Sequence, residues 1–171
     1  MDLLTHLFLP ITVVYVLRPD LFPSPWYLIF SVFAVIPDID KPLHLQGAFH
    51  SAITLGIIAG ALIILERWQR DDLTYALLIT ALLFSHLLLD ILDGGPVTLL
   101  YPLSDMGIGF HYPTKLIVGG TIGTTGIQDP FPTVSVNSIN RSRTTYSVIT
   151  GYGVLSAVTF LTIYLTEEYV R

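Results

Sequence analysis

Histidine and aspartate side chains occur in two short polar stretches that interrupt otherwise apolar sequence. The first stretch holds Asp38 and Asp40 and is followed by His50, and the second holds His86 and Asp90. Imidazole nitrogens and carboxylate oxygens are ligands for zinc, manganese and iron. Ionisable groups set in or beside apolar helices are costly, which makes them candidates for function. The two stretches therefore predict one metal site built from segments far apart in the sequence.

Spacing and helix position support this interpretation. His86 and Asp90 are four residues apart, so a helix would place them on one face, as in helical zinc motifs. Asp38, Asp40 and Asp90 lie at the carboxyl ends of predicted helices, where the helix dipole disfavours negative charge by about 0.3–1 kcal/mol each. A bound cation would offset that cost and the repulsion between the carboxylates.

The composition is that of a membrane protein. Of 171 residues, 52% are hydrophobic and 12% are charged, whereas soluble domains carry about 25% charged residues. The chain has no cysteine, which excludes disulfides and thiolate ligands and leaves histidine and carboxylate for any metal. A net charge of −5 provides no basic surface, so we predict no nucleic-acid partner.

The apolar runs predict an all-α fold, a polytopic membrane helix bundle of about five segments within one domain over residues 1–171. The segments are residues 3–17, 26–36, 48–65, 73–92 and 145–165. Residues 93–144 are rich in Gly, Pro, Thr and Ser and predict an extramembrane loop or lid within that domain. Within this loop, residues 116–122 are typical of a small β-hairpin with a Gly119-Gly120 turn.

Alternation of the five segments across a membrane brings the polar residues to one face. His6 begins the first segment, Asp38 and Asp40 follow the second, His50 begins the third, and His86 and Asp90 end the fourth. The predicted metal ligands are therefore His6, Asp38, Asp40, His50, His86 and Asp90. His44 and His111 fall on the same face and are interpreted as interfacial and loop residues. Arginines in the short loops of the opposite face favour placing that face inside the cell and the site outside.

Each residue also has a plainer interpretation. Asp40 is suited to cap a short helix beginning at Pro42. His86 and Asp90 are also consistent with a structural hydrogen-bonded pair, and His6 with a solvated residue near a terminus. The convergence of six residues on one face favours the metal site over these separate explanations.

The ordered motifs resemble the YdjM-like family of predicted membrane-bound metal-dependent hydrolases over about residues 1–103. The motifs are Thr5-His6, Pro37-Asp38-Ile39-Asp40, Gly47 followed by His50-Ser51, Ser85-His86-Leu87-Leu88-Leu89-Asp90 and Leu100-Tyr101-Pro102. The resemblance implies a helical protein of the plasma membrane with these six His/Asp residues as its site. It also implies a distant similarity to zinc-dependent phospholipase C and single-strand nucleases, which hydrolyse phosphoesters. Lys41 and Leu45-Gln46 depart from the family pattern, which often has histidine after the second aspartate and His-Arg before the glycine.

The predicted function is hydrolysis of a phosphoester or lipid-linked substrate at the membrane face. A divalent ion, zinc first and manganese or iron as alternatives, would lower the pKa of bound water to near 7. Asp40 or Asp93 is the predicted general base. The alternatives are a metal or proton transporter and a non-enzymatic membrane regulator with a structural metal. The predicted partners are the lipid bilayer and the substrate.

Overall fold

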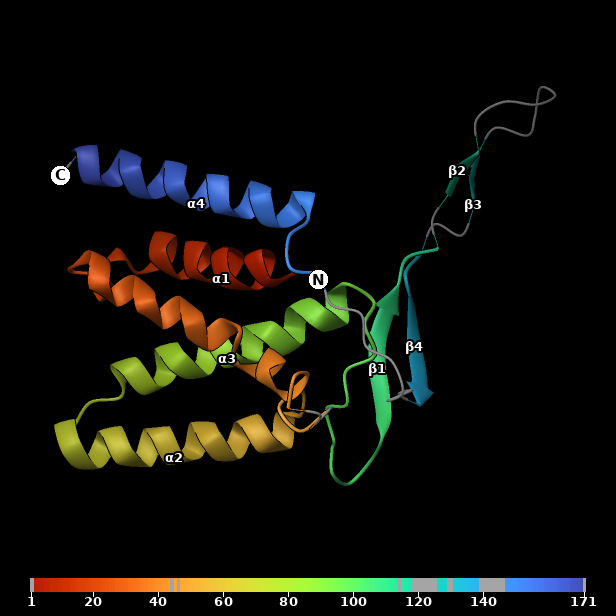
Figure 1. The fold of residues 1–171 in the computed structure, drawn as a ribbon, viewed down its shortest axis with the longest axis horizontal. Coiled ribbons are helices and arrows are strands. Elements are labelled where there is room, and N and C mark those ends of the chain that lie inside the picture. Colours follow the sequence, from red (N-terminus) through yellow and green to blue (C-terminus); the bar gives the residue numbers. More distant parts are fainter. Residues whose placement is uncertain are drawn as a thin grey trace.

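The computed structural model describes residues 2–43, 45, 47–113, 115–117, 126–128, 131–138 and 147–170. It shows a helical bundle with an extended β-arm at one end (Figure 1). The α-helices are α1 (Leu3–Leu17), α2 (Ala52–Arg70), α3 (Thr74–Leu92) and α4 (Gly151–Val170). Three 3₁₀ segments connect α1 to α2: η1 (Pro19–Leu21), η2 (Pro25–Ala34) and η3 (Ile36–Asp40). The predicted helical fold is confirmed in this coarse form.

The helices begin at side chains that satisfy their first backbone N–H groups. Asp2 accepts a hydrogen bond from the backbone N–H of Thr5 at the start of α1. Ser51 does the same for the first turn of α2. Helix α3 is capped by its neighbour, because the Glu66 carboxylate accepts from the backbone N–H groups at the start of α3. These two hydrogen bonds to Glu66 fix the loop between α2 and α3.

Among the described residues, helices α2 and α3 are long and apolar enough to cross a membrane, while α1 and η2 are apolar but shorter. The 19 residues of each longer helix extend about 28 Å, close to the hydrocarbon thickness of about 30 Å. The second predicted segment forms a 3₁₀ helix of 10 residues. At about 2.0 Å per residue it extends about 20 Å. The crossing of all five segments stays a prediction.

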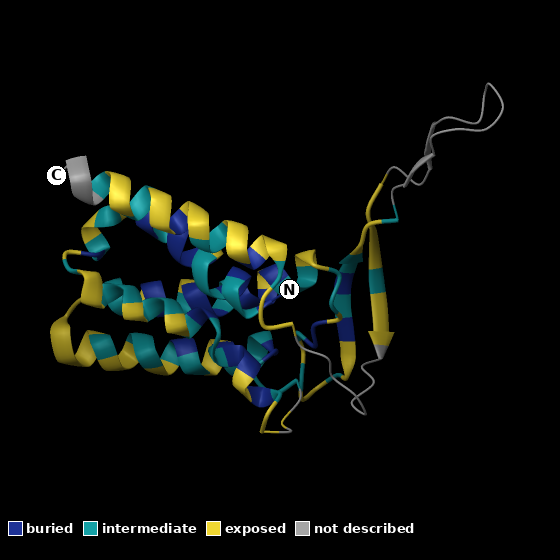
Figure 2. Cartoon of the chain, turned by 45° about the horizontal axis from the view of Figure 1, so that its top comes forward, coloured by how far each residue is buried: buried dark blue, intermediate teal, exposed yellow. Residues whose placement is uncertain are grey.

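Apolar side chains lie both inside and outside the bundle. Leu55 of α2 packs with Ile79, Leu83 and Leu87 of α3. On the outside, Ile64 of α2 is 72% exposed, and the outward faces of α2 and α4 are exposed along much of their length (Figure 2). Large exposed apolar faces of this kind mark contact surfaces, and lipid tails are the environment that suits them.

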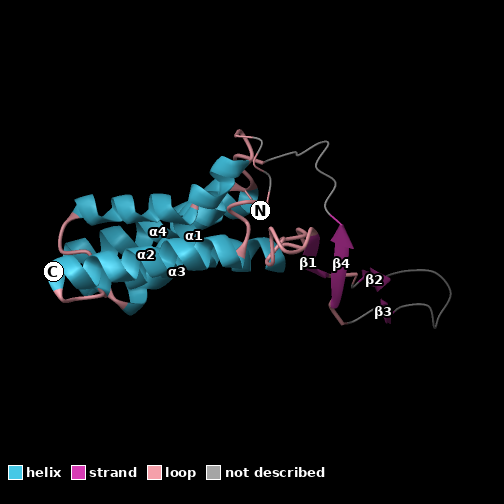
Figure 3. Ribbon diagram, turned by 90° about the horizontal axis from the view of Figure 1, so that it is seen from below, coloured by secondary structure: helices cyan, strands magenta, loops and turns pink. Residues whose placement is uncertain are grey.

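The described residues of the predicted 93–144 loop include an antiparallel arm that leaves the bundle beside the end of α3 (Figure 3). Strand β1 (Met106–His111) pairs with β4 (Thr133–Ser138), and further out β2 (Lys115–Ile117) pairs with β3 (Gly126–Gln128). The first strand of the predicted hairpin is therefore present as β2, but β2 pairs with residues 126–128. The predicted turn and return strand at 118–122 lie outside the described residues.

Glycines allow the arm to pack directly on the end of α3. Gly94 has a φ of +85°, and a Cβ there would lie 2.8 Å from the carbonyl oxygen of Phe110. A Cβ on Gly109 would lie 2.6 Å from the carbonyl oxygen of Gly95. These contacts are too short for any side chain, so the root of the arm is held one helical turn beyond Asp90.

Candidate metal centre

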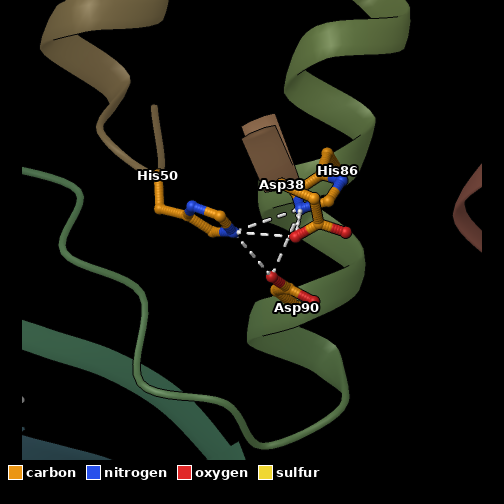
Figure 4. A group of neighbouring side chains, drawn as sticks. All are labelled: Asp38, His50, His86 and Asp90. Carbon is orange, nitrogen blue, oxygen red and sulfur yellow. Dashed lines mark hydrogen bonds and ion pairs between the residues drawn. The ribbon is translucent and has the colours of Figure 1, made fainter. Parts of the chain in front are cut away.

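Four side chains from three elements converge at the end of the bundle that carries the arm (Figure 4). Asp38 comes from η3, His50 from the residues just before α2, and His86 and Asp90 from successive turns of α3. Each offers one nitrogen or oxygen atom, and the four atoms lie within 4.8 Å of one another. This group could hold a metal ion.

The distances between these atoms match the size of a single-ion site. His86 Nε2 lies 3.2 Å from His50 Nε2, 3.3 Å from Asp38 Oδ1 and 3.4 Å from Asp90 Oδ2. His50 Nε2 lies 3.5 Å from Asp38 Oδ1 and 3.4 Å from Asp90 Oδ2. Ligands about 2.0–2.1 Å from a tetrahedral zinc ion are about 3.3–3.4 Å apart. The donor set and its spacing therefore fit a divalent ion bound by two imidazoles and two carboxylates.

His86 is oriented by a backbone carbonyl. Its Nδ1 lies 2.8 Å from the carbonyl oxygen of Ala34, which can only accept, so Nδ1 carries the proton. The lone pair is then on Nε2, the atom that faces the other donors. Such an outer hydrogen bond is typical of metal-binding histidines. The ring of His6 stacks on His86 with 4.0 Å between centroids.

Asp40 orients the His50 ring, as the Ala34 carbonyl orients His86. His50 Nδ1 donates to Asp40 Oδ2 over 2.9 Å, and the backbone N–H of Gly47 donates to the same oxygen over 3.1 Å. The other oxygen, Oδ1, is buried without a hydrogen-bond partner. Residues 41–43 form a turn, so the interpretation of Asp40 as the cap of a helix from Pro42 is wrong.

His6 contacts the group through Asp90. Its Nε2 donates to Asp90 Oδ1 over 3.0 Å, on the opposite side of the carboxylate from the oxygen that faces His50 and His86. The Nδ1 of His6 is buried without a partner. The structure thus brings all six predicted residues together, with four as the inner donors and His6 and Asp40 hydrogen-bonded to them.

The charges of the group favour a bound cation. Burial raises the pKa of Asp38, but hydrogen bonds from His50 and His86 outweigh it and hold the pKa well below its usual range. Burial lowers the pKa of His50, but hydrogen bonds to Asp38 and Asp40 raise it to about 10. The Asp38 carboxylate therefore stays ionised, and in the absence of a metal the His50 imidazole takes up a proton beside it.

The remaining motif residues form the scaffold of the site. Gly47 has a φ of +91°, a conformation that suits glycine, and it turns its N–H toward Asp40. Ser51 Oγ donates to the carbonyl oxygen of Tyr101 over 2.6 Å while it caps α2. The motifs around residues 47–51 and 100–102 are therefore tied together beside His50.

Other predicted residues lie elsewhere. Asp93 is exposed and lines a separate open pocket of about 620 Å³ with Asp2 and Thr150. His111 is exposed at the end of β1, and His44 lies outside the described residues. Neither Asp93 nor His111 belongs to the four-donor group.

Two groups at the site were missed by sequence reasoning. The Ala34 carbonyl gives no residue signal, because any amino acid supplies one. Lys41 was interpreted as the loss of a ligand, yet its Nζ hydrogen-bonds to Asp38 Oδ1. The i,i+3 spacing from Asp38 was the available signal.

Comparison with known proteins identifies the family of the chain. The sequence matches the family described as YdjM inner membrane protein over residues 1–169. This match confirms the resemblance and extends it through the arm and α4. It also agrees with the two candidate membrane-spanning helices and confirms the predicted location in the inner (plasma) membrane. No curated protein and no solved structure matches the chain.

Proposed function

Because the chain belongs to the YdjM inner membrane protein family, we propose that it is a membrane-bound metal-dependent hydrolase. The observation that carries this proposal is the group formed by Asp38, His50, His86 and Asp90, whose four donor atoms are spaced for one divalent ion. The substrate class we propose is a phosphoester, either lipid-linked or presented at the membrane surface.

The proposed membrane arrangement is a five-segment bundle formed by α1, η2, α2, α3 and α4. The metal centre and the β-arm lie at one end, with the exposed side chains of Trp26 and Trp68, each 84% exposed, near the other. Exposed tryptophans are typical of the interface between membrane and water. The metal centre would then lie at the depth of the lipid headgroups on the opposite surface.

The roles of the residues follow from their contacts. Asp38, His50, His86 and Asp90 would hold the ion, which when bound supplies Lewis acidity and lowers the pKa of a bound water. Asp40 and His6 would keep His50 and Asp90 in place. Of the two predicted general bases, Asp40 accepts a hydrogen bond on the far side of the His50 ring and so serves to position His50, whereas Asp93 is exposed beside a separate pocket.

The number of donors bears on whether the site is catalytic. Four protein ligands complete the tetrahedral shell of a structural zinc ion, while a catalytic ion needs a position for water. Manganese or iron, with a larger preferred shell, would keep positions for water beside the same four residues. With zinc, the four closely spaced donors would leave no position for water. This spacing favours the second candidate function, a membrane regulator with a structural metal.

Transport is disfavoured by where the buried ionisable groups lie. Among the described residues, the buried aspartate and histidine side chains all lie at the end of the bundle that carries the arm: Asp2, His6, Asp38, Asp40, His50 and His86. A transport path needs polar groups that continue across the membrane.

The test combines metal analysis with an assay of hydrolysis. Purified wild-type protein is compared with His86→Ala and Asp90→Ala, with the exposed His111→Ala and Asp93→Ala as matched controls. We expect about one divalent ion per chain in wild type and controls, and loss of metal in the two site variants. Equal metal content in all five proteins would contradict the site. Metal without hydrolysis of soluble phosphodiesters or phospholipids would favour the structural alternative.

A further inference from the structure

Lys41 lies directly beside the proposed metal centre. Its Nζ hydrogen-bonds to Asp38 Oδ1, the same oxygen that faces His50 and His86. The side chain of Lys41 is 24% exposed and that of Asp38 is 8% exposed. Lys41 is therefore more accessible to solvent than the aspartate that it contacts.

Phosphoester hydrolysis places negative charge on several oxygens at once, and many phosphatases and nucleases meet it with two metal ions about 3.5–4 Å apart. In the part of the chain that the structure describes, one group of donors suited to an ion is present. A lysine ammonium is a compact positive charge that binds phosphate. Lys41 therefore lies where a second positive charge would be useful beside a single ion.

The balance of charge points the same way. Asp38, Asp40 and Asp90 bring three negative charges to the site, which a divalent ion and one ammonium neutralise. Without Lys41, the metal-loaded site would keep a net negative charge and repel an anionic substrate. The charge of Lys41 should therefore affect the binding of an anionic ligand more than the binding of the metal.

We propose that Lys41 is the second cationic group of this site and binds the phosphoryl oxyanion of the ligand next to a single bound ion. This inference rests on the proposed function and narrows it to a mononuclear site that takes tetrahedral oxyanions. The plainer alternative is that Lys41 serves only to hold Asp38 in place.

Phosphate binding to metal-loaded full-length protein separates these roles without relying on turnover. Inorganic phosphate is titrated by calorimetry into wild type, Lys41→Gln, Lys41→Arg and the control Lys115→Gln, whose lysine lies in β2 of the arm. Metal content is measured on the same samples. We expect one ion per chain throughout, with phosphate affinity about tenfold or more weaker in Lys41→Gln, largely kept in Lys41→Arg and unchanged in Lys115→Gln.

A further competition experiment identifies the source of the oxyanion. Micelles doped with short-chain phosphatidylglycerol are added to compete with inorganic phosphate for the site. Competition that depends on Lys41 identifies a lipid headgroup as the ligand. Phosphate binding that the micelles do not reduce identifies a soluble ligand. Equal phosphate affinity in wild type and Lys41→Gln, both metal-loaded, would overturn the role of Lys41 and leave the hydrolase proposal standing. Loss of metal in Lys41→Gln would also overturn it in favour of the plainer role. A wild-type protein that binds no metal would overturn both proposals.

Discussion

The Nδ1 atom of His50 lies 2.9 Å from Oδ2 of Asp40, a buried carboxylate that is not itself among the four inner donors. A carboxylate in this place fixes the tautomer of the imidazole and increases the basicity of the nitrogen that would face a bound ion. Asp40 is held in turn by the backbone N–H of Gly47. The affinity of the site for metal should therefore depend on a residue that does not touch the ion.

Replacing this carboxylate by an amide tests that dependence. Asp40→Asn keeps the size of the side chain but removes the charge behind His50. Removal of such an outer partner typically lowers metal affinity by about 10–100-fold, so we expect a loss of that size with one ion still bound at saturation. The affinity is measured by competition with a chelator, and Asp93→Asn, exposed beside a separate pocket, is the control. Equal affinity of Asp40→Asn and wild type would contradict the role assigned to Asp40.

Metal binding should depend on pH because protons compete for the histidines. Without an ion, contacts with Asp38 and Asp40 raise the pKa of His50 to about 10, so at neutral pH this imidazole carries a proton that a metal must displace. Metal affinity should therefore rise with pH between about 6 and 8, and binding should release protons. Calorimetry in two buffers of different ionisation enthalpy measures the release. Affinity that falls with rising pH, or binding without proton release, would speak against His50 as a ligand.

Much of the site could be predicted from the sequence, because the signals were local or followed from alternation. The i,i+4 spacing of His86 and Asp90 on a helix placed both at one site, and alternating segments sorted all six residues to one end. The division between inner donors and supporting residues could not be predicted. Asp38 and Asp40 lie in a 3₁₀ helix, where three residues make a turn, so side chains two residues apart point in different directions. One of them reaches the donor group and the other reaches behind His50.

The arm shows a second limit of sequence reasoning. A glycine pair flanked by apolar residues predicts a tight hairpin, but the observed pairs join residues 106–111 to 133–138 and residues 115–117 to 126–128. Register over that separation is set by contacts at both ends rather than by the turn alone. At the root, Gly107 and Gly109 pack on the backbone after α3, and that contact depends on tertiary structure.

Two glycines predict opposite effects of the same substitution. In Gly47→Ala, the methyl group would lie 2.9 Å from Thr98 Oγ1 on a backbone with a φ of +91°, so we expect destabilisation of about 1–3 kcal/mol. In Gly60→Ala, the methyl group would have nothing within 4 Å and would sit in helix α2, where alanine is favoured over glycine by about 1 kcal/mol. Thermal unfolding of the purified proteins in detergent compares them. A Gly47→Ala variant as stable as wild type would contradict the strained turn behind His50.

The last prediction concerns which side of the membrane the metal centre faces. Arg18 follows α1, and Arg67 and Arg70 end α2, so the short connections at the end of the bundle away from the site carry arginine. Basic short loops are retained inside the cell, which predicts that the metal centre and the arm face outward.

The natural chain has no cysteine, so single cysteines report the topology without background. In intact cells, a membrane-impermeant maleimide should label Leu103→Cys, which is 82% exposed near the root of the arm, and should label Gln69→Cys at the end of α2 only after the cells are opened. Labelling of Gln69→Cys alone in intact cells would place the metal centre on the inside instead. Labelling of both would contradict a membrane-spanning bundle with the two sites on opposite faces.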